Sequence, residues 1–145
     1  MQVMIPSPRH YENMYGSSNL VRAYLDHIEK KIQEAYPPEV YDVFDVLYIS
    51  LLIARPDELA RGLFLGSNTF DWRGKFAGIG VNGDFERYHS GNDLDKIHVL
   101  SAMLQMVFLQ LSQKKKAKFH CSLANEIVIY STQFFEKKFR EQACT

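Results

Sequence analysis

The chain has 145 residues, of which 46% are hydrophobic and 23% charged, a composition typical of a globular protein rather than a disordered one. This length predicts a single domain that spans residues 1–145. The 17 basic and 17 acidic residues balance, so the chain has no net charge that would attract nucleic acid or an anionic membrane.

The cellular location is predicted from the termini and the cysteines. Residues 1–9 lack the basic and apolar regions of a signal peptide, and the apolar run from Val46 to Ala54 is shorter than the ~20 residues that cross a bilayer. Cys121 and Cys144 are the only cysteines, and reduced thiols are the better interpretation than a disulfide between them. We therefore expect a cytoplasmic protein with no membrane partner.

The N-terminal half contains one clear helix. Residues 1–18 include Pro6, Pro8 and Gly16 and are expected to be irregular. From Asn19 the apolar residues follow helical spacing, until Pro37 and the proline after it end the pattern. The predicted buried face is Val21, Tyr24, Leu25, Ile28, Ile32 and Ala35.

The segment 43–54 fits two structures. Val43, Leu47 and Leu51 have helical spacing, but the segment is rich in β-branched and aromatic residues and is apolar on both alternating faces. That composition favours a strand buried on both sides. We expect a strand here, followed by a helical turn at 56–61 and a short strand at 62–66.

Residues 78–83 (GIGVNG) match the G-x-G-x-x-G fingerprint of dinucleotide-binding proteins. That fingerprint requires a helix directly after the glycines, but Gly91 follows before two helical turns could form. Asn82-Gly83 is also the strongest signal for a two-residue type I′ hairpin, with Val81 paired to Asp84. We therefore expect a hairpin and no nucleotide cofactor.

Two more helices are predicted after the hairpin. Asn92 is a suitable N-cap for an apolar helix from Asp93 to Ser112, which ends at a lysine cluster. Ser122 is expected to cap a last helix through Leu123, Ile127, Tyr130, Phe134 and Lys138. The predicted fold is α+β, an antiparallel sheet with a central hairpin packed against N-terminal, central and C-terminal helices.

The residues that most often carry catalysis or metal binding do not form a recognised motif. The five histidines and Cys121 lack zinc-site spacing, and G-x-S-x-G is absent. The lysines at 114, 115, 116 and 118 suit the end of an apolar helix better than a phosphate grip. The acidic pairs fall where turns, caps or solvated faces favour acids, so we expect no metal and no catalytic site. These pairs are Asp42/Asp45, Asp57/Glu58, Asp84/Glu86 and Asp93/Asp95.

Residues 70–79 (FDWRGKFAGI), followed by Gly91-Asn92-Asp93-Leu94 and the apolar helix, resemble immunity proteins of bacterial contact-dependent growth inhibition and polymorphic toxin systems. The resemblance covers about residues 44–112 and implies a stoichiometric inhibitor of a secreted toxin domain, with no active site of its own. Nuclease toxins must be basic to hold phosphates, so their inhibitors present carboxylates. The expected partner-binding residues are Trp72, Asp84, Glu86, Asp93 and Asp95. Trp72 fits an exposed aromatic anchor, and it fits a core position at the start of a strand at least as well.

Three other functions compete with this interpretation. They are a small hydrolase, a nucleic-acid binder that uses the lysine cluster, and a structural adaptor or homodimer joined through the apolar helix. Gene neighbourhood separates them, since an immunity gene directly follows the gene of a large secreted toxin.

Overall fold

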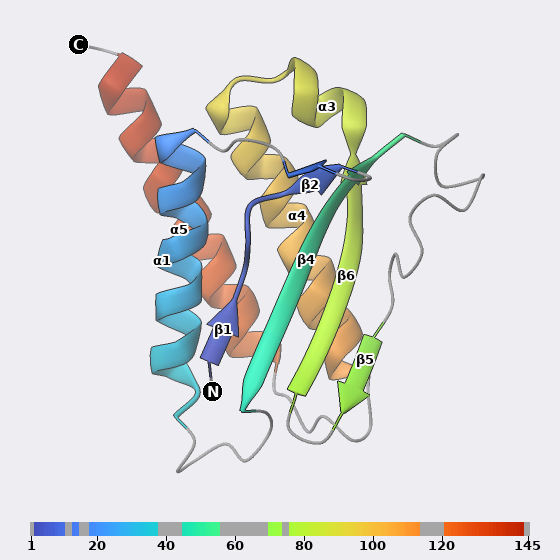
Figure 1. The fold of residues 1–145 in the computed structure, drawn as a ribbon. Helices are drawn as coiled ribbons and strands as arrows, with labels where there is room; N and C mark the ends of the chain where they lie inside the picture. Colours follow the sequence, from blue (N-terminus) through green and yellow to red (C-terminus); the bar gives the residue numbers. More distant parts are fainter. Residues whose placement is uncertain are drawn as a thin grey trace.

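The computed structural model of the protein describes residues 2–10, 13–14, 18–37, 45–55, 70–73, 76–113 and 121–143. Helix α1 lies among the N-terminal strands, and the other described helices follow the last strand of the sheet (Figure 1). The strands are β1 (Gln2–Met4), β2 (Arg9–His10), β3 (Asn13–Met14), β4 (Val46–Ala54), β5 (Phe70–Arg73) and β6 (Phe76–Asp84). The helices are α1 (Asn19–Ala35), α3 (Phe85–Ser90), α4 (Asp93–Ser112) and α5 (Cys121–Ala143).

The sheet is mixed and is organised around β4. Its strand order is β3-β2-β4-β6-β5, and β1 also pairs with β4. The three strands that pair with β4, namely β1, β2 and β6, all run parallel to it. The face of β4 that carries Leu51 is buried throughout, whereas on the opposite face Leu52 is buried and Tyr48 and Ser50 are half-buried, so the expected burial on both sides is met only in part. The segment 46–54 is thus a strand, as its composition predicts, and β1, β2 and β3 lie in the segment expected to be irregular.

The predicted antiparallel sheet with a central hairpin at Asn82-Gly83 is wrong. β6 runs through both residues to Asp84 and pairs with β4 in one parallel register along nine residues. Val81, expected opposite Asp84, lies opposite Leu51. Antiparallel pairing involves β5 with β6 and β2 with β3, so it lies outside the centre of the sheet.

Gly83 permits close packing and does not form a turn. A type I′ turn needs positive φ at both central residues, whereas φ of Gly83 lies outside the left-handed region. A Cβ atom at this position would lie 2.4 Å from Met103 Sδ and 3.0 Å from Ile53 Cδ1. Helix α4 therefore approaches β6 closely because position 83 carries no side chain. The long register with β4 outweighs the local turn preference of Asn-Gly.

Helix α3 occupies the place of the expected returning strand. Asp84 is its N-cap, and Oδ1 of Asp84 accepts a hydrogen bond from the N–H of Arg87 at 3.1 Å. Arg87 and His89 lie in the last turn, where cations interact favourably with the helix dipole. Gly91 ends the helix, so the segment carries both a start and a stop signal for a helix of six residues.

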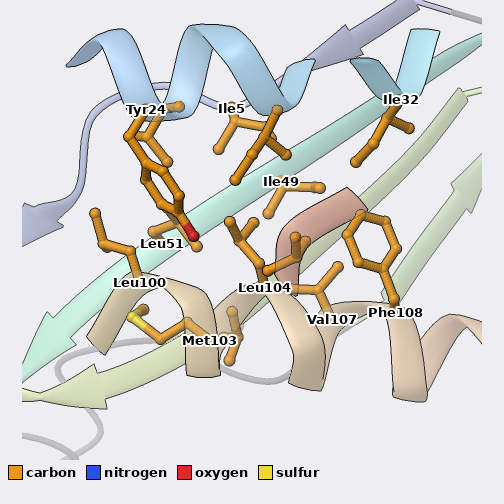
Figure 2. Packing of buried hydrophobic residues seen from close by; sticks show 14 of the residues in the cluster. Ile5, Tyr24, Ile32, Ile49, Leu51, Leu100, Met103, Leu104, Val107 and Phe108 are labelled. Carbon is orange, nitrogen blue, oxygen red and sulfur yellow. The ribbon is translucent and has the colours of Figure 1, made fainter. Parts of the chain in front are cut away.

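Helices α1, α4 and α5 lie on the same side of the sheet (Figure 1). The core is formed where α1 and α4 pack over β4. In this core Leu51 of β4 lies between Tyr24 of α1 and Leu100 of α4 (Figure 2). Helix α5 packs mainly against α1 and α4, and so forms a layer outside them. One face of β4 is fully buried by this arrangement, through Leu47, Ile49, Leu51 and Ile53.

The bounds of α1 and α4 confirm the sequence prediction. Oγ of Ser18 accepts a hydrogen bond from the N–H of Val21 at the start of α1, which ends before Pro37. At the start of α4, Asn92 and Asp95 form a capping box in which each side chain accepts from the other residue's N–H. These local signals define the helices independently of the sheet topology.

Helix α4 is the one helix in the described ranges whose length and mean hydropathy suffice to cross a membrane. Half of that stretch is buried inside the fold, where α4 packs against α5 and β6. The core helix of a globular protein meets the same criteria, so this is weak evidence for a membrane span.

The last predicted helix is α5, which begins at Cys121, one residue before the expected cap Ser122. Its buried residues Ala124, Val128, Ser131 and Phe135 are offset from the predicted series Leu123, Ile127, Tyr130 and Phe134. The turn expected at 56–61, the strand expected at 62–66 and the lysine cluster at 114–118 lie outside the described residues.

Candidate functional site

A pocket of about 300 Å³ lies between the carboxyl end of β6, the start of α3 and one side of α4. We call it the β6–α4 pocket. Ligands of sheets with parallel strands bind at the carboxyl ends of those strands, because the following loops and helix starts converge there. The pocket is lined by Val81, Asn82, Gly83, Asp84, Arg87, Val99, Ala102, Met103, Met106 and Gln110.

The floor of the pocket is apolar. Val81 of β6 and Val99 and Met103 of α4 are buried. Met103 reaches the strand because Gly83 leaves room for its sulfur atom. Methionine has three rotatable bonds and a polarizable sulfur, so a floor built on Met103 can adapt to the shape of an inserted side chain.

The rim of the pocket carries opposite charges. Asp84 and Arg87 are both exposed at the start of α3, and the hydrogen bond from the Arg87 N–H to Asp84 Oδ1 fixes the Asp84 carboxylate at the helix N-terminus. Gln110 of α4 adds an amide, and Asn82 of β6 another. An apolar floor with a few polar groups around it is the usual form of a binding pocket.

The outer face of α4 continues the apolar surface beyond the pocket. Met106, which lines the pocket, is 48% exposed, and Leu109 is 49% exposed. Exposed apolar residues beside a pocket mark an interaction surface when they are contiguous with it. The arrangement is suited to hold an apolar side chain of a partner and to surround it with polar contacts.

Away from the pocket, two aromatic side chains of α3 contact cations from neighbouring elements. The guanidinium of Arg55, the residue after β4, lies 4.4 Å from the ring centroid of Phe85, which is 4.2 Å from the ring of His89. The ammonium of Lys96 lies 5.6 Å from the ring of Tyr88. These contacts attach α3 to the ends of β4 and α4, so they support the wall of the pocket.

The structure separates the expected partner-binding residues. Asp84 lines the β6–α4 pocket, and Glu86 is exposed in the same first turn of α3. Asp95 is engaged in the capping box of α4, and Asp93 lines a different depression beside Asn19 and Lys138. Trp72 lies in β5, where its backbone pairs with Ala77. The four carboxylates therefore do not form one patch.

Arg87, Met103 and Met106 are site residues that sequence reasoning missed. Their contribution depends on the parallel register of β6, which brings α3 and α4 together at one end of the strand. The local signals that could have indicated a helix at this place are Asp84 as its N-cap and Gly91 as its end.

The glycine fingerprint does precede a helix, contrary to the prediction, but it is not a phosphate loop. All three glycines lie within β6, whose register with β4 extends to Asp84. In a dinucleotide-binding fold the glycines form the turn between strand and helix, where their amides face the pyrophosphate. Here the residues that would form that turn are paired with β4.

The other residues that could bind a metal or act as acids and bases do not cluster in the described part of the chain. Within the described residues, no group of three or more His, Cys, Asp or Glu side chains could hold a metal ion. Of the expected acidic pairs, Asp42/Asp45 and Asp57/Glu58 include residues outside the described ranges. His98, on the polar side of α4, has its Nε2 3.9 Å from Glu136 Oε2 of α5.

Comparisons of the chain with models of known families, with curated proteins and with solved structures find no match.

Proposed function

We propose that this protein is an immunity protein that binds the toxic domain of a cognate secreted bacterial toxin, in the cytoplasm, and neutralises it without turnover. The observation that carries the proposal is the β6–α4 pocket, with its apolar floor, charged rim and adjoining exposed Met106 and Leu109. The sequence resemblance to immunity proteins supplies the class of partner.

The pocket has the properties of an anchor site in a protein–protein interface. Such interfaces depend on a few large side chains that enter well-packed pockets and are surrounded by polar contacts that exclude water. A volume of about 300 Å³ over Met103 and Val99 accommodates one aromatic or long aliphatic side chain of the toxin. Asp84 and Arg87 at the rim then offer charged hydrogen-bonding partners.

The chemistry of the pocket favours binding over catalysis. Its lining in the described part of the chain contains one carboxylate and one guanidinium, and no His, Cys, Ser or Lys that would serve as nucleophile or base. The carboxylate of Asp84 accepts a hydrogen bond from a backbone amide, which is a structural use. A stoichiometric inhibitor needs no more than this.

Two carboxylates at the start of α3, beside the basic Arg87, are available to a basic, nucleic-acid-cleaving toxin. Asp84 and Glu86 are exposed at the first turn of α3, beside the pocket. A carboxylate at the rim raises the association rate with a basic partner, whereas a carboxylate buried at the centre of the contact determines the dissociation rate.

A substitution that fills the pocket and leaves the core unchanged tests this proposal. Ala102 lines the pocket from the exposed face of α4, so Ala102→Trp should block it while the fold remains intact. Calorimetry with the C-terminal domain of the toxin encoded directly upstream should show at least tenfold weaker binding for Ala102→Trp. Ala102→Ser, the control at the same position, should bind as the native protein does. Unchanged affinity of Ala102→Trp would exclude this pocket from the interface.

A further inference from the structure

Two methionine thioethers bound the β6–α4 pocket, one on its floor and one at its rim. A Cβ atom at Gly83 would lie 2.4 Å from Met103 Sδ and 3.0 Å from Met103 Cε, so the thioether of Met103 rests directly on the backbone of β6. Met103 is 4% exposed, whereas Met106, which also lines the pocket, is 48% exposed. A side chain that enters the pocket therefore meets sulfur on two sides.

This lining discriminates between kinds of apolar side chain. A thioether makes favourable contacts with the edge of an aromatic ring, in addition to the burial of apolar surface that any hydrocarbon gains. The unbranched methionine side chain also adjusts to a flat ring by rotation about its own bonds. The floor over Gly83 thus favours an aromatic occupant over an aliphatic one of the same size.

The rim supplies two groups that suit an aromatic ring with a polar edge. Oδ1 of Asp84 accepts the Arg87 N–H at 3.1 Å, but across the described ranges neither Asp84 Oδ2 nor the Arg87 guanidinium has a hydrogen-bond or ion-pair partner. A guanidinium stacks on the face of an aromatic ring. A carboxylate oxygen accepts a hydrogen bond from a phenol O–H or an indole N–H.

We propose that the β6–α4 pocket takes an aromatic side chain with a hydrogen-bond donor at its edge, tyrosine or tryptophan, and that Met103 determines this preference. The apolar part of the ring contacts Met103 and Val99, its donor reaches Asp84, and Arg87 lies over its face. Tyrosine and tryptophan are the residues that most often anchor protein interfaces, because they combine a large apolar body with a polar edge. The toxin as the source of this side chain rests on the proposed function, whereas the preference of the pocket does not.

Side-chain analogues test the preference on the full chain without a toxin. The probes are para-cresol and skatole, which reproduce the side chains of tyrosine and tryptophan, and the readout is the NMR spectrum of protein labelled at its methionine methyl groups. Both probes should shift the signals of Met103 and Met106 saturably, while Met4 of β1, which is not part of the pocket lining, stays unshifted. The tighter of the two probes identifies the preferred residue.

Two matched compounds separate the contributions of the ring and of the donor. Methylcyclohexanol is para-cresol without its aromatic face, and methylanisole is para-cresol with its hydroxyl methylated, so each should bind about fivefold more weakly than para-cresol. Met103→Leu, which removes the sulfur at nearly constant volume, should abolish the preference for para-cresol over methylcyclohexanol. The matched control Met106→Leu, at the rim, should keep it.

Each outcome bears on one part of the proposal. No saturable shift at Met103 and Met106 with either aromatic probe, or equal affinity for methylcyclohexanol, would overturn the aromatic preference. Equal affinity for methylanisole would overturn the role of the donor, and a preference that survives Met103→Leu would overturn the role of Met103.

Failure of the pocket preference is distinguishable from failure of the immunity function. A toxin domain that binds the native protein but not Ala102→Trp, combined with probes that do not bind, would retain the immunity function and exclude an aromatic anchor. Probes that bind as expected, combined with no binding to any neighbouring toxin, would retain the pocket preference and exclude the immunity function.

Discussion

Glu29 of α1 accepts a hydrogen bond from the backbone N–H of Ile5, with 2.5 Å between Oε1 and the nitrogen. One turn further along the helix, Gln33 Oε1 accepts from the N–H of Val3 at 2.7 Å. Arg22 completes the series by donating to the carbonyl of Ile5 at 2.8 Å. Side chains of α1 thus satisfy the backbone along the outer edge of β1, which otherwise offers a template for unwanted strand pairing.

Removing the Glu29 acceptor should destabilise the fold. Glu29→Ala leaves the amide of Ile5 without its partner in a partly buried position, which costs about 1–3 kcal/mol of unfolding free energy. Glu29→Gln keeps a carbonyl acceptor and should lose less. Urea denaturation of the two variants measures the difference, and equal losses would show that the hydrogen bond is not what stabilises this edge.

Tyr24 should make the protein sensitive to alkaline pH. Burial raises the pKa of Tyr24 to about 12, although its hydrogen bonds with Thr132 and Ser101 partly lower that pKa. Because the folded pKa exceeds the unfolded value of about 10, the stabilisation is complete below pH 10 and is lost as pH rises toward 12. Tyr24→Phe should unfold more easily at pH 9, by about 1 kcal/mol, but lose less stability between pH 9 and 12.

Denaturation curves at pH 9 and pH 12 measure this effect. Lysines and other tyrosines change the stability of the native protein and of Tyr24→Phe equally, so the difference between the two proteins reports on Tyr24. A pH dependence identical in the native protein and Tyr24→Phe would contradict the burial of a neutral Tyr24 hydroxyl.

Gly91 should tolerate substitution less well than Gly83. A Cβ at Gly91 would lie 2.4 Å from Asp95 Cβ and 2.9 Å from the backbone oxygen of Arg87, neither of which can move without shifting a helix. At Gly83 the closest atom is the sulfur of Met103, a flexible side chain. Gly91→Ala should therefore cost about 1–3 kcal/mol and Gly83→Ala less. Thermal unfolding ranks the two, and the reverse order would contradict the corner between α3 and α4.

Nucleotides such as NAD, FAD and ATP should not bind specifically. The glycines of the apparent fingerprint lie inside β6 and not in a turn before a helix, so their amides do not converge on one phosphate site. Calorimetry at millimolar nucleotide should give no saturable isotherm. A single saturable site that is lost in Gly80→Val would show that the motif binds nucleotide after all.

The parts of the fold that follow from local signals could be predicted. Ser18, Asn92 and the apolar spacing determine α1 and α4, because capping and burial act within a few residues. β4 could be identified from its apolar run. The direction of β6 relative to β4 could not be predicted, because it depends on contacts between segments that are far apart in the chain.

The error at Asn82-Gly83 has the same origin. The dipeptide favours a turn locally, but pairing with β4 over nine residues and the packing of Met103 against Gly83 stabilise the extended strand. The same error affects the site. The charge of Asp84 predicts a binding role, whereas Arg87 and Met106 line the same pocket only because β6 runs straight into α3 and packs against α4.

Calorimetric titration with the C-terminal domain of the upstream toxin tests most directly whether the chain neutralises a toxin by one-to-one binding through the β6–α4 pocket. We expect saturation at one chain per toxin domain. Asp84→Asn with Glu86→Gln should weaken binding while preserving the cap of α3, because Asn is as good an N-cap as Asp. Absence of binding to any toxin encoded beside this gene would contradict the immunity function itself.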